Sequence, residues 1–330
     1  MGINLFINPN FGKTISPEKN METELARNYR LLNNSFERKI TFHLGAEAGF
    51  FSEFNNMVLA VIYCLDNKIK FSLYSKNANF ALSNGWTDFF TPFCKERSFF
   101  LHSRYNRRSY QMRNAKTLPP KVLKLLSGDD FLTQDIWDHM RTPDFSSKRF
   151  TIPELNLYDA PLLRATQTII KMIWKYNESG IKIIKEYKDS INLPANYISI
   201  HIRAGDKIKE IKTYTIHEYM DAASELSPNK SAFILTDNYS VIEELKKSYK
   251  DWNFLTLCEP KERGYIHSEF VKLDKHQRYL QHLKLFASLD ICAAADKFIG
   301  TYSSNPGMFM GMRIGQEKCI GIDYDSWVLW

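Results

Sequence analysis

The side chains best suited to chemistry follow a strand-like run in the C-terminal half of the chain. Residues 198–207 read Ile-Ser-Ile-His-Ile-Arg-Ala-Gly-Asp-Lys, and strand alternation separates the isoleucines from His201 and Arg203. Open α/β sheets bind ligands at the carboxyl ends of their strands, where a guanidinium can hold a pyrophosphate. The segment therefore predicts an anion site with Asp206 and Lys207 at its mouth. The competing interpretation is a structural ion pair between Arg203 and Asp206.

Two other segments also place polar residues after a strand-like run. Residues 299–307 predict a strand end, a hydroxyl-rich turn and a helix that begins near Pro306. Ser303, Ser304 and the backbone amides beside them suit phosphate oxygens, although an ordinary helix cap explains the same residues. Asp237 ends the third run, where it could contact a ribose, a base or a sugar, or could cap the next helix.

A parallel sheet is needed to bring these residues together, and the second half of the chain predicts one. Strand-like runs alternate there with helical runs, which is typical of a doubly wound α/β domain. The strands are expected at Tyr197–Arg203, Ala232–Leu235, Phe254–Leu257, Phe298–Thr301 and Cys319–Ile322, and the helices at Thr215–Leu226, Val241–Tyr249, Lys275–Ala295 and Pro306–Ile314.

The first half predicts a second α/β unit. A strand near Thr41–Gly45, a helix over Phe50–Leu65 and a strand over Lys68–Tyr74 follow one another after an irregular arm or first helix in residues 1–35. Residues 162–190 predict one long helix that Gly180 could interrupt. The stretch 192–196 is a linker, so we expect domains over residues 1–191 and 192–330.

Composition narrows the class of protein. The 330 residues are 44% hydrophobic and 25% charged, which excludes a disordered, collagenous or coiled-coil chain and fits two domains. The net charge of +7 favours an anionic ligand or surface. The chain lacks G-x-G-x-x-G, G-K-[ST] and H-E-x-x-H, which argues against a Rossmann dehydrogenase, a P-loop NTPase and a zincin.

Compartment and metal content can also be predicted from the sequence. Five scattered cysteines without C-x-x-C spacing indicate reduced thiols and no zinc site. The apolar run Met57–Leu65 is too short to span a bilayer, and the N-terminus lacks the pattern of a secretory signal. We therefore expect a cytoplasmic protein, with peripheral membrane contact as an open alternative.

A basic segment lies in the first half, in residues 102–113. It carries Arg104, Arg107, Arg108 and Arg113 among two tyrosines. A contact for an anionic acceptor, a membrane surface or a nucleic acid would use such a patch, and a plain solvated face is the alternative. We expect no nucleic-acid partner.

The C-terminal motifs together resemble the α-1,6-fucosyltransferases, the family of the N-glycan core enzyme and the rhizobial nodulation enzyme. His201-Ile-Arg-Ala-Gly-Asp-Lys207 is similar to the family's His-x-Arg-Arg-x-Asp-Lys strand. Thr236-Asp237-Asn238 resembles its Thr-Asp-Asp, and Thr301-Tyr302-Ser303-Ser304 its Thr-Phe-Ser-Ser. More loosely, residues 49–56 resemble its Gly-Phe-Gly-x-Gln-x-His-His turn.

The resemblance implies the GT-B fold, two Rossmann-like domains that face a cleft, and a metal-independent, inverting transfer from GDP-β-L-fucose without another cofactor. Arg203 would hold the β-phosphate, His201 would lie near guanine or ribose, and Lys207 and Glu210 near the acceptor hydroxyl, with Glu210 as base. The donor-binding set that it implies is His201, Arg203, Gly49, Phe50, Asp237, Asp290, Tyr302, Ser303, Ser304 and Asn305.

The chain also departs from the family pattern. Ala204 replaces the second arginine, Asn55 and Asn56 replace the two histidines, and Asp290 lies two residues closer to the hydroxyl turn than its counterpart. These differences leave two alternatives open. One is a GT-B transferase that uses another nucleotide sugar, and the other is a non-catalytic nucleotide-sugar-binding protein.

Overall fold

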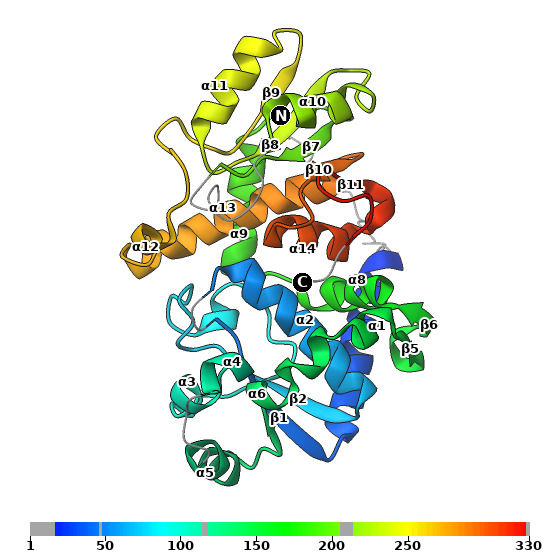
Figure 1. The fold of residues 1–330 in the computed structure, drawn as a ribbon, viewed down its shortest axis with the longest axis vertical. Helices are drawn as coiled ribbons and strands as arrows, with labels where there is room; N and C mark the ends of the chain where they lie inside the picture. Colours follow the sequence, from blue (N-terminus) through cyan, green and yellow to red (C-terminus); the bar gives the residue numbers. More distant parts are fainter. Residues whose placement is uncertain (1–16, 46–47, 114–117, 205–213, 328–330) are drawn as a thin grey trace, which may run out of the picture.

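Two parallel β-sheets, one in each half of the chain, organise the fold (Figure 1). A computed structural model describes residues 17–45, 48–113, 118–204 and 214–327. The first sheet has the order β3-β2-β1-β4 and the second the order β11-β10-β7-β8-β9. The strands of the first are β1 (Arg38–His43), β2 (Ile69–Tyr74), β3 (Lys95–Glu96) and β4 (Phe131–Leu132); those of the second are β7 (Ile198–His201), β8 (Ser231–Leu235), β9 (Asn253–Leu255), β10 (Phe298–Gly300) and β11 (Cys319–Gly321).

The two sheets share one topology. In each, the first strand of the half lies beside the second on one side and beside the fourth on the other. This is the Rossmann order, in which the chain changes direction across the sheet between the first and fourth strands. The switch points lie between β1 and β4 and between β7 and β10, and both Rossmann-like units expected from the sequence are confirmed.

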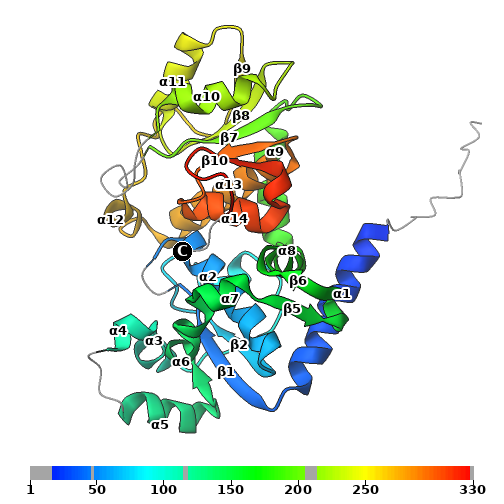
Figure 2. The same ribbon diagram turned by 45° about the vertical axis from the view of Figure 1, so that its right-hand side comes forward.

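Helices cover both sheets and fill the space between them. In Figures 1 and 2, α2, α13 and α14 lie between the sheets, while α1 runs along the edge of the first half beside α8 and the β5–β6 hairpin. The helices are α1 (Pro17–Ser35), α2 (Phe50–Asp66), α3 (His102–Tyr105), α4 (Ser109–Met112), α5 (Leu118–Ser127), α6 (Thr133–Trp137), α7 (Pro143–Ser147), α8 (Leu162–Ile173), α9 (Glu178–Asp189), α10 (Ile216–Ser224), α11 (Tyr239–Ser248), α12 (His267–Phe270), α13 (Lys275–Ala294) and α14 (Asn305–Ile314); the hairpin is β5 (Arg149–Ile152) and β6 (Leu157–Pro161).

The single helix predicted over residues 162–190 is wrong. Two helices, α8 and α9, are separated by residues 174–177. These residues are extended because they bond to the segment around Phe89: the amide of Thr91 donates to the carbonyl of Lys175 at 2.8 Å, and the amide of Asn177 to the carbonyl of Phe89 at 3.0 Å. Asn177 then caps α9 by accepting from the amide of Gly180 at 2.7 Å. The interruption therefore precedes Gly180, which lies inside the helix.

Other predictions from the sequence agree with the structure. The five cysteines are free. The predicted strands and helices of the second half coincide with β7 to β11 and with α10, α11, α13 and α14, within a few residues at each end. None of the helices within the described ranges is both long and apolar enough to cross a membrane.

The domain division after residue 191 stays a prediction, since α9 packs against α13 of the second half.

An aromatic cluster joins the two halves. Phe50 of α2 lies 4.7 Å, between ring centroids, from Phe286 of α13, and Trp174 lies 5.2 Å from the same ring. Phe51 of α2 and Phe309 of α14 are also 4.7 Å apart. All of these rings are buried, and aromatic contacts at such distances stabilise a core beyond their buried area. The N-terminal ends of α2 and α14 are therefore held beside each other.

We predict that Phe286→Ala lowers the free energy of unfolding by about 3–5 kcal/mol, because it leaves a cavity at the centre of this cluster. Denaturant unfolding followed by tryptophan fluorescence measures the change, with Phe100→Ala as the matched control. Phe100 is 68% exposed, so its truncation should stay within about 0.5 kcal/mol. Equal effects of the two substitutions would contradict the central role of the cluster.

Four histidines lie in the interior. Burial lowers the pKa of His43, His102 and His282 to about 4 and that of His201 to about 3. An unfolded histidine has a pKa near 6.5, so between pH 6.5 and 4 the unfolded chain binds protons that the native chain does not. The stability that these neutral histidines contribute is present above pH 6.5 and is lost as the pH falls.

We predict that the free energy of unfolding falls as the pH is lowered from 7 to 5. The slope of this fall measures the protons that the unfolded chain binds in excess of the native chain, and His201→Gln should reduce that excess by up to about one proton. Urea unfolding at pH 7, 6 and 5 measures both slopes. Identical slopes for the variant and the parent chain would show that His201 titrates alike in the two states.

Candidate active site

The predicted anion site lies at the switch point of the second sheet. His201 ends β7 and Arg203 follows two residues later, while the hydroxyl turn at residues 301–304 follows β10. The two strands pair directly, with Ile200 opposite Ile299. A Cβ added to Gly300 would lie 3.6 Å from the Cβ of His201, so the two strand ends are in contact. The structure thus brings His201, Arg203 and the hydroxyl turn to the same edge.

Three buried polar atoms of His201 and the hydroxyl turn have no protein partner. They are Nδ1 of His201, Oγ of Ser303 and the hydroxyl of Tyr302, whose ring lies in the hydrophobic core. His201 is 7% exposed, and burial followed by the nearby charge of Arg203 lowers its pKa to about 3, which keeps the ring neutral. Buried polar groups in native proteins nearly always have a partner. A ligand at the switch point would supply the missing ones.

Ser304, by contrast, is a helix cap. Its Oγ accepts from the amide of Gly307 at 3.1 Å and donates to the carbonyl of Thr301 at 2.8 Å. Gly307 permits this close turn, because a Cβ there would lie 2.0 Å from the Thr301 oxygen. Of the two interpretations of this serine, the cap explains its hydroxyl fully.

The backbone amides of the turn were expected to bind phosphate, and in this structure they are occupied. The amides of Tyr302 and Ser303 each donate to the carboxylate of Asp323 at 2.8 Å. The amide of Ser304 donates to the carbonyl of Thr301 at 3.2 Å. Asp323 was missed in the sequence, although a carboxylate directly after the last predicted strand is a signal that could have identified it.

Asp237 fixes the end of β7. Its carboxylate accepts from the amide of Ala204 and from the amide of Tyr265, each at 3.1 Å. The second of the two alternatives, a helix cap, is wrong, since Asn238 caps α11 by accepting from the amide of Ser240 at 3.0 Å. Asp237 therefore holds the backbone that carries Arg203.

Three other residues of the predicted donor set have structural contacts. The Asp290 carboxylate pairs with Arg313 at 2.7 Å and links α13 to α14. The side chains of Phe50 and Tyr302 are buried in the hydrophobic core, so neither ring faces the switch point as a stacking surface. Gly49 precedes α2, is exposed, and has open space around its Cα.

The residues predicted at the mouth of the site lie outside the described ranges. They are Gly205, Asp206, Lys207 and Glu210. Their positions relative to Arg203, and the alternative ion pair between Arg203 and Asp206, are therefore not described. Arg203 itself is half-buried.

The basic segment does not form a uniform cationic face. Arg108 pairs with the buried Glu53 and lies 4.8 Å from the ring of Trp137. Arg107 donates from Nε to the carbonyl of Ser103 at 2.8 Å. Arg104 and Arg113 are exposed. Only part of the predicted patch therefore presents its charge outward.

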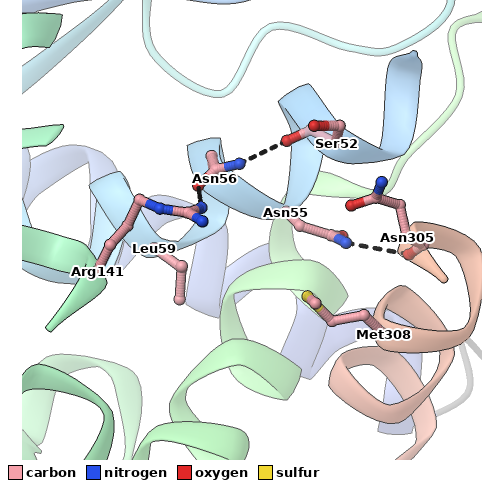
Figure 3. Close-up of a pocket in the computed structure, with 7 residues that line it drawn as sticks. All are labelled: Ser52, Asn55, Asn56, Leu59, Arg141, Asn305 and Met308. Atoms are coloured by element: carbon pink, nitrogen blue, oxygen red, sulfur yellow. Dashed lines mark hydrogen bonds between the residues drawn. The ribbon is translucent and has the colours of Figure 1, made fainter. Parts of the chain in front are cut away.

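A cavity of about 90 Å³, which we name the α2–α14 pocket, lies between the two halves (Figure 3). Asn55 of α2 crosses it and donates from Nδ2 to the carbonyl of Asn305 at 3.0 Å. Arg141 of the 3₁₀ turn His139–Arg141 lines its other side and gave no signal in the sequence. The lining residues are Ser52, Asn55, Asn56, Leu59, Arg141, Asn305 and Met308.

Among the described residues, no three histidine, cysteine or carboxylate side chains are grouped as a metal site would require.

Comparison with known proteins gives the family. The sequence model of the alpha-(1,6)-fucosyltransferase N- and catalytic domains matches residues 18–273. No curated protein matches the sequence.

The fold is similar to solved fucosyltransferases. NodZ alpha-1,6-fucosyltransferase soaked with GDP-fucose superposes with a TM-score of 0.51 at 14% identity, over 84% of this chain and 93% of that one. Fucosyltransferase NodZ from Bradyrhizobium superposes with a TM-score of 0.51 at 13% identity, over 88% of this chain and 96% of that one. NodZ alpha-1,6-fucosyltransferase co-crystallized with GDP superposes with a TM-score of 0.50 at 14% identity, over 87% of this chain and 95% of that one.

The expected GT-B fold is thereby confirmed, with two Rossmann-like units facing each other across the pocket region. Because the family model covers most of the chain, the protein belongs to the α-1,6-fucosyltransferase family and is a fucosyltransferase.

Proposed function

We propose that the protein transfers L-fucose from GDP-β-L-fucose to a glycan hydroxyl with inversion, without a metal, and in α-1,6 linkage. The observation that carries this proposal is the switch point of the second sheet, where Nδ1 of His201, close to Arg203, and Oγ of Ser303 are buried without partners. Ligands of doubly wound sheets bind at this place. The NodZ structures named with GDP-fucose and GDP support the choice of nucleotide.

The diphosphate is held mainly by side chains. Because Asp323 accepts from the amides of Tyr302 and Ser303, a phosphate cannot use those donors while the carboxylate remains there. Arg203 contacts the β-phosphate, with a hydrogen bond from the hydroxyl of Ser303. A guanidinium can donate two parallel hydrogen bonds to phosphate oxygens. Neutral His201 faces the ribose or guanine, which it can contact without adding charge.

The reaction needs a cation at the leaving group and a base at the acceptor. The bond between the fucosyl carbon and the GDP oxygen breaks as the acceptor oxygen attacks from the opposite face, and the electron pair leaves with GDP. Fixed positive charge from Arg203 lowers this barrier because it stabilises the developing diphosphate charge. Glu210 takes the proton of the acceptor hydroxyl, and Lys207 and Asp206 complete the mouth of the site.

The remaining parts of the proposal concern the acceptor side and the cell. Residues 1–191 form the acceptor-side domain, with Gly49 at the start of α2 as its contact to the donor, and residues 192–330 form the donor domain. The protein acts in the cytoplasm, on a glycan assembled there, with peripheral membrane contact through the basic segment.

We predict selective binding of GDP. In the presence of EDTA, thermal stabilisation and calorimetry should show binding of GDP and none of comparable strength for UDP, CMP or NAD. GDP-fucose should then serve as a donor and GDP-mannose should not. Stronger binding of UDP than of GDP would contradict the proposed donor.

We predict that Arg203→Ala lowers kcat for fucosyl transfer by about hundredfold or more, because the leaving diphosphate loses its fixed cation. Arg263→Ala is the matched control, since Arg263 lies in the same half and forms an exposed pair with Glu243. The control should keep its activity, and both variants should keep the parent unfolding transition. Near-normal transfer by a folded Arg203→Ala variant would disprove the assignment.

A further inference from the structure

The α2–α14 pocket carries chemistry that the proposed donor site does not use. Most of its lining comes from the first half of the chain, and it meets the second half at Asn305 and Met308. Asn305 is the first residue of α14 and follows Ser304 of the hydroxyl turn. The pocket is therefore adjacent to the hydroxyl turn of the switch-point site.

Arg141 gives the pocket a positive charge. Its Nη1 donates to Oδ1 of Asn56 at 2.5 Å, and its guanidinium lies 5.4 Å from the ring of Trp137. Within the described parts of the chain, no carboxylate lies within 4.0 Å of this guanidinium. The neighbouring Arg108 is neutralised by Glu53. Arg141 is also exposed, so a ligand can reach it from solvent.

Asn55 supplies the second, independent observation. Its side chain is 2% exposed, and its Oδ1 is buried without a hydrogen-bond donor. The bond from Nδ2 to the carbonyl of Asn305 fixes which end of the amide is the oxygen. Figure 3 shows Asn55 between the side chains of Arg141 on one side and Asn305 on the other. A ligand hydroxyl would satisfy the free oxygen.

These groups together define a ligand with two properties. It carries anionic oxygens for the Arg141 guanidinium and a hydroxyl that donates to Oδ1 of Asn55, while Ser52 offers a further hydroxyl at the rim. The volume of about 90 Å³ holds several water molecules, which is enough for one edge of a sugar and too little for an oligosaccharide. A planar carboxylate matches the single guanidinium.

We propose that the α2–α14 pocket is an acceptor subsite for a carboxylate-bearing sugar, with Arg141 as its cation and Asn55 as its hydroxyl acceptor. The assignment of this ligand to the acceptor rests on the proposed fucosyl transfer, in which the donor occupies the switch point of the second sheet. The binding of an acidic sugar by the pocket does not depend on that transfer and can be measured without it.

The test compares methyl β-D-glucuronide with methyl β-D-glucoside by NMR titration of the full chain, with and without saturating GDP. We expect the glucuronide to bind at least about tenfold more tightly than the uncharged glucoside, and salt to weaken the binding. Arg141→Gln and Ser52→Asp should each abolish this preference. Ser52→Asp keeps Arg141 in place and adds a competing carboxylate, so it remains informative if loss of the guanidinium disturbs the turn.

Controls separate this proposal from its alternatives. Arg149→Gln, which removes an exposed arginine paired with Asp159, should keep the preference, and Arg141→Lys should keep part of it. Equal binding of the two glycosides would overturn the proposal. A parallel loss of GDP affinity in Arg141→Gln would also overturn it, because the pocket would then hold a donor phosphate. Failure of the proposed function would instead appear as absent GDP binding in the parent chain, with the glucuronide preference intact.

Discussion

The contact between α2 and the pair α13 and α14 is the constraint on which the rest of the structure depends. Each Rossmann-like unit can position the ends of its own strands, but neither unit by itself fixes its distance from the other unit. The aromatic cluster around Phe286 and Trp174 does so, because close-packed rings resist sliding. It sets the N-terminal ends of α2 and α14 beside each other, so that Asn55 of one half reaches the backbone of the other.

The periodic parts of the fold could be predicted from sequence. Strands such as Ile198–His201 and helices such as Lys275–Ala294 carry their own signals, namely apolar runs, capping residues and turn residues. A candidate site could be predicted for the same reason, since polar residues directly after a buried strand are uncommon unless they serve a ligand or a structural contact. His201, Arg203 and Ser303 were predicted in this way, and their binding of a ligand stays a prediction.

The parts that could not be predicted depend on partners far away in the sequence. Residues 174–177 have helical neighbours, yet bonds to Phe89 and Thr91 hold them extended. Ser303 and Ser304 are the same residue type in adjacent positions, and only the three-dimensional partners show that one hydroxyl caps a helix while the other has none. Arg141 has no local pattern at all, and its proposed role follows from its contact with Asn56 of α2.

The charge at the candidate site depends on which of its polar groups already have hydrogen-bond partners within the protein and which are kept neutral by burial. Asp323 takes the two amides that would otherwise add positive potential at the turn, and burial keeps His201 uncharged. Arg203 brings a guanidinium to this edge of the sheet, on a strand end held by Asp237. In the family pattern a second arginine stands where this chain has Ala204. If the proposed donor binds there, its diphosphate meets one guanidinium of this strand end where the family pattern has two, so transfer should be more sensitive to the position of Arg203, and Asp237 would act as a positioning residue for it.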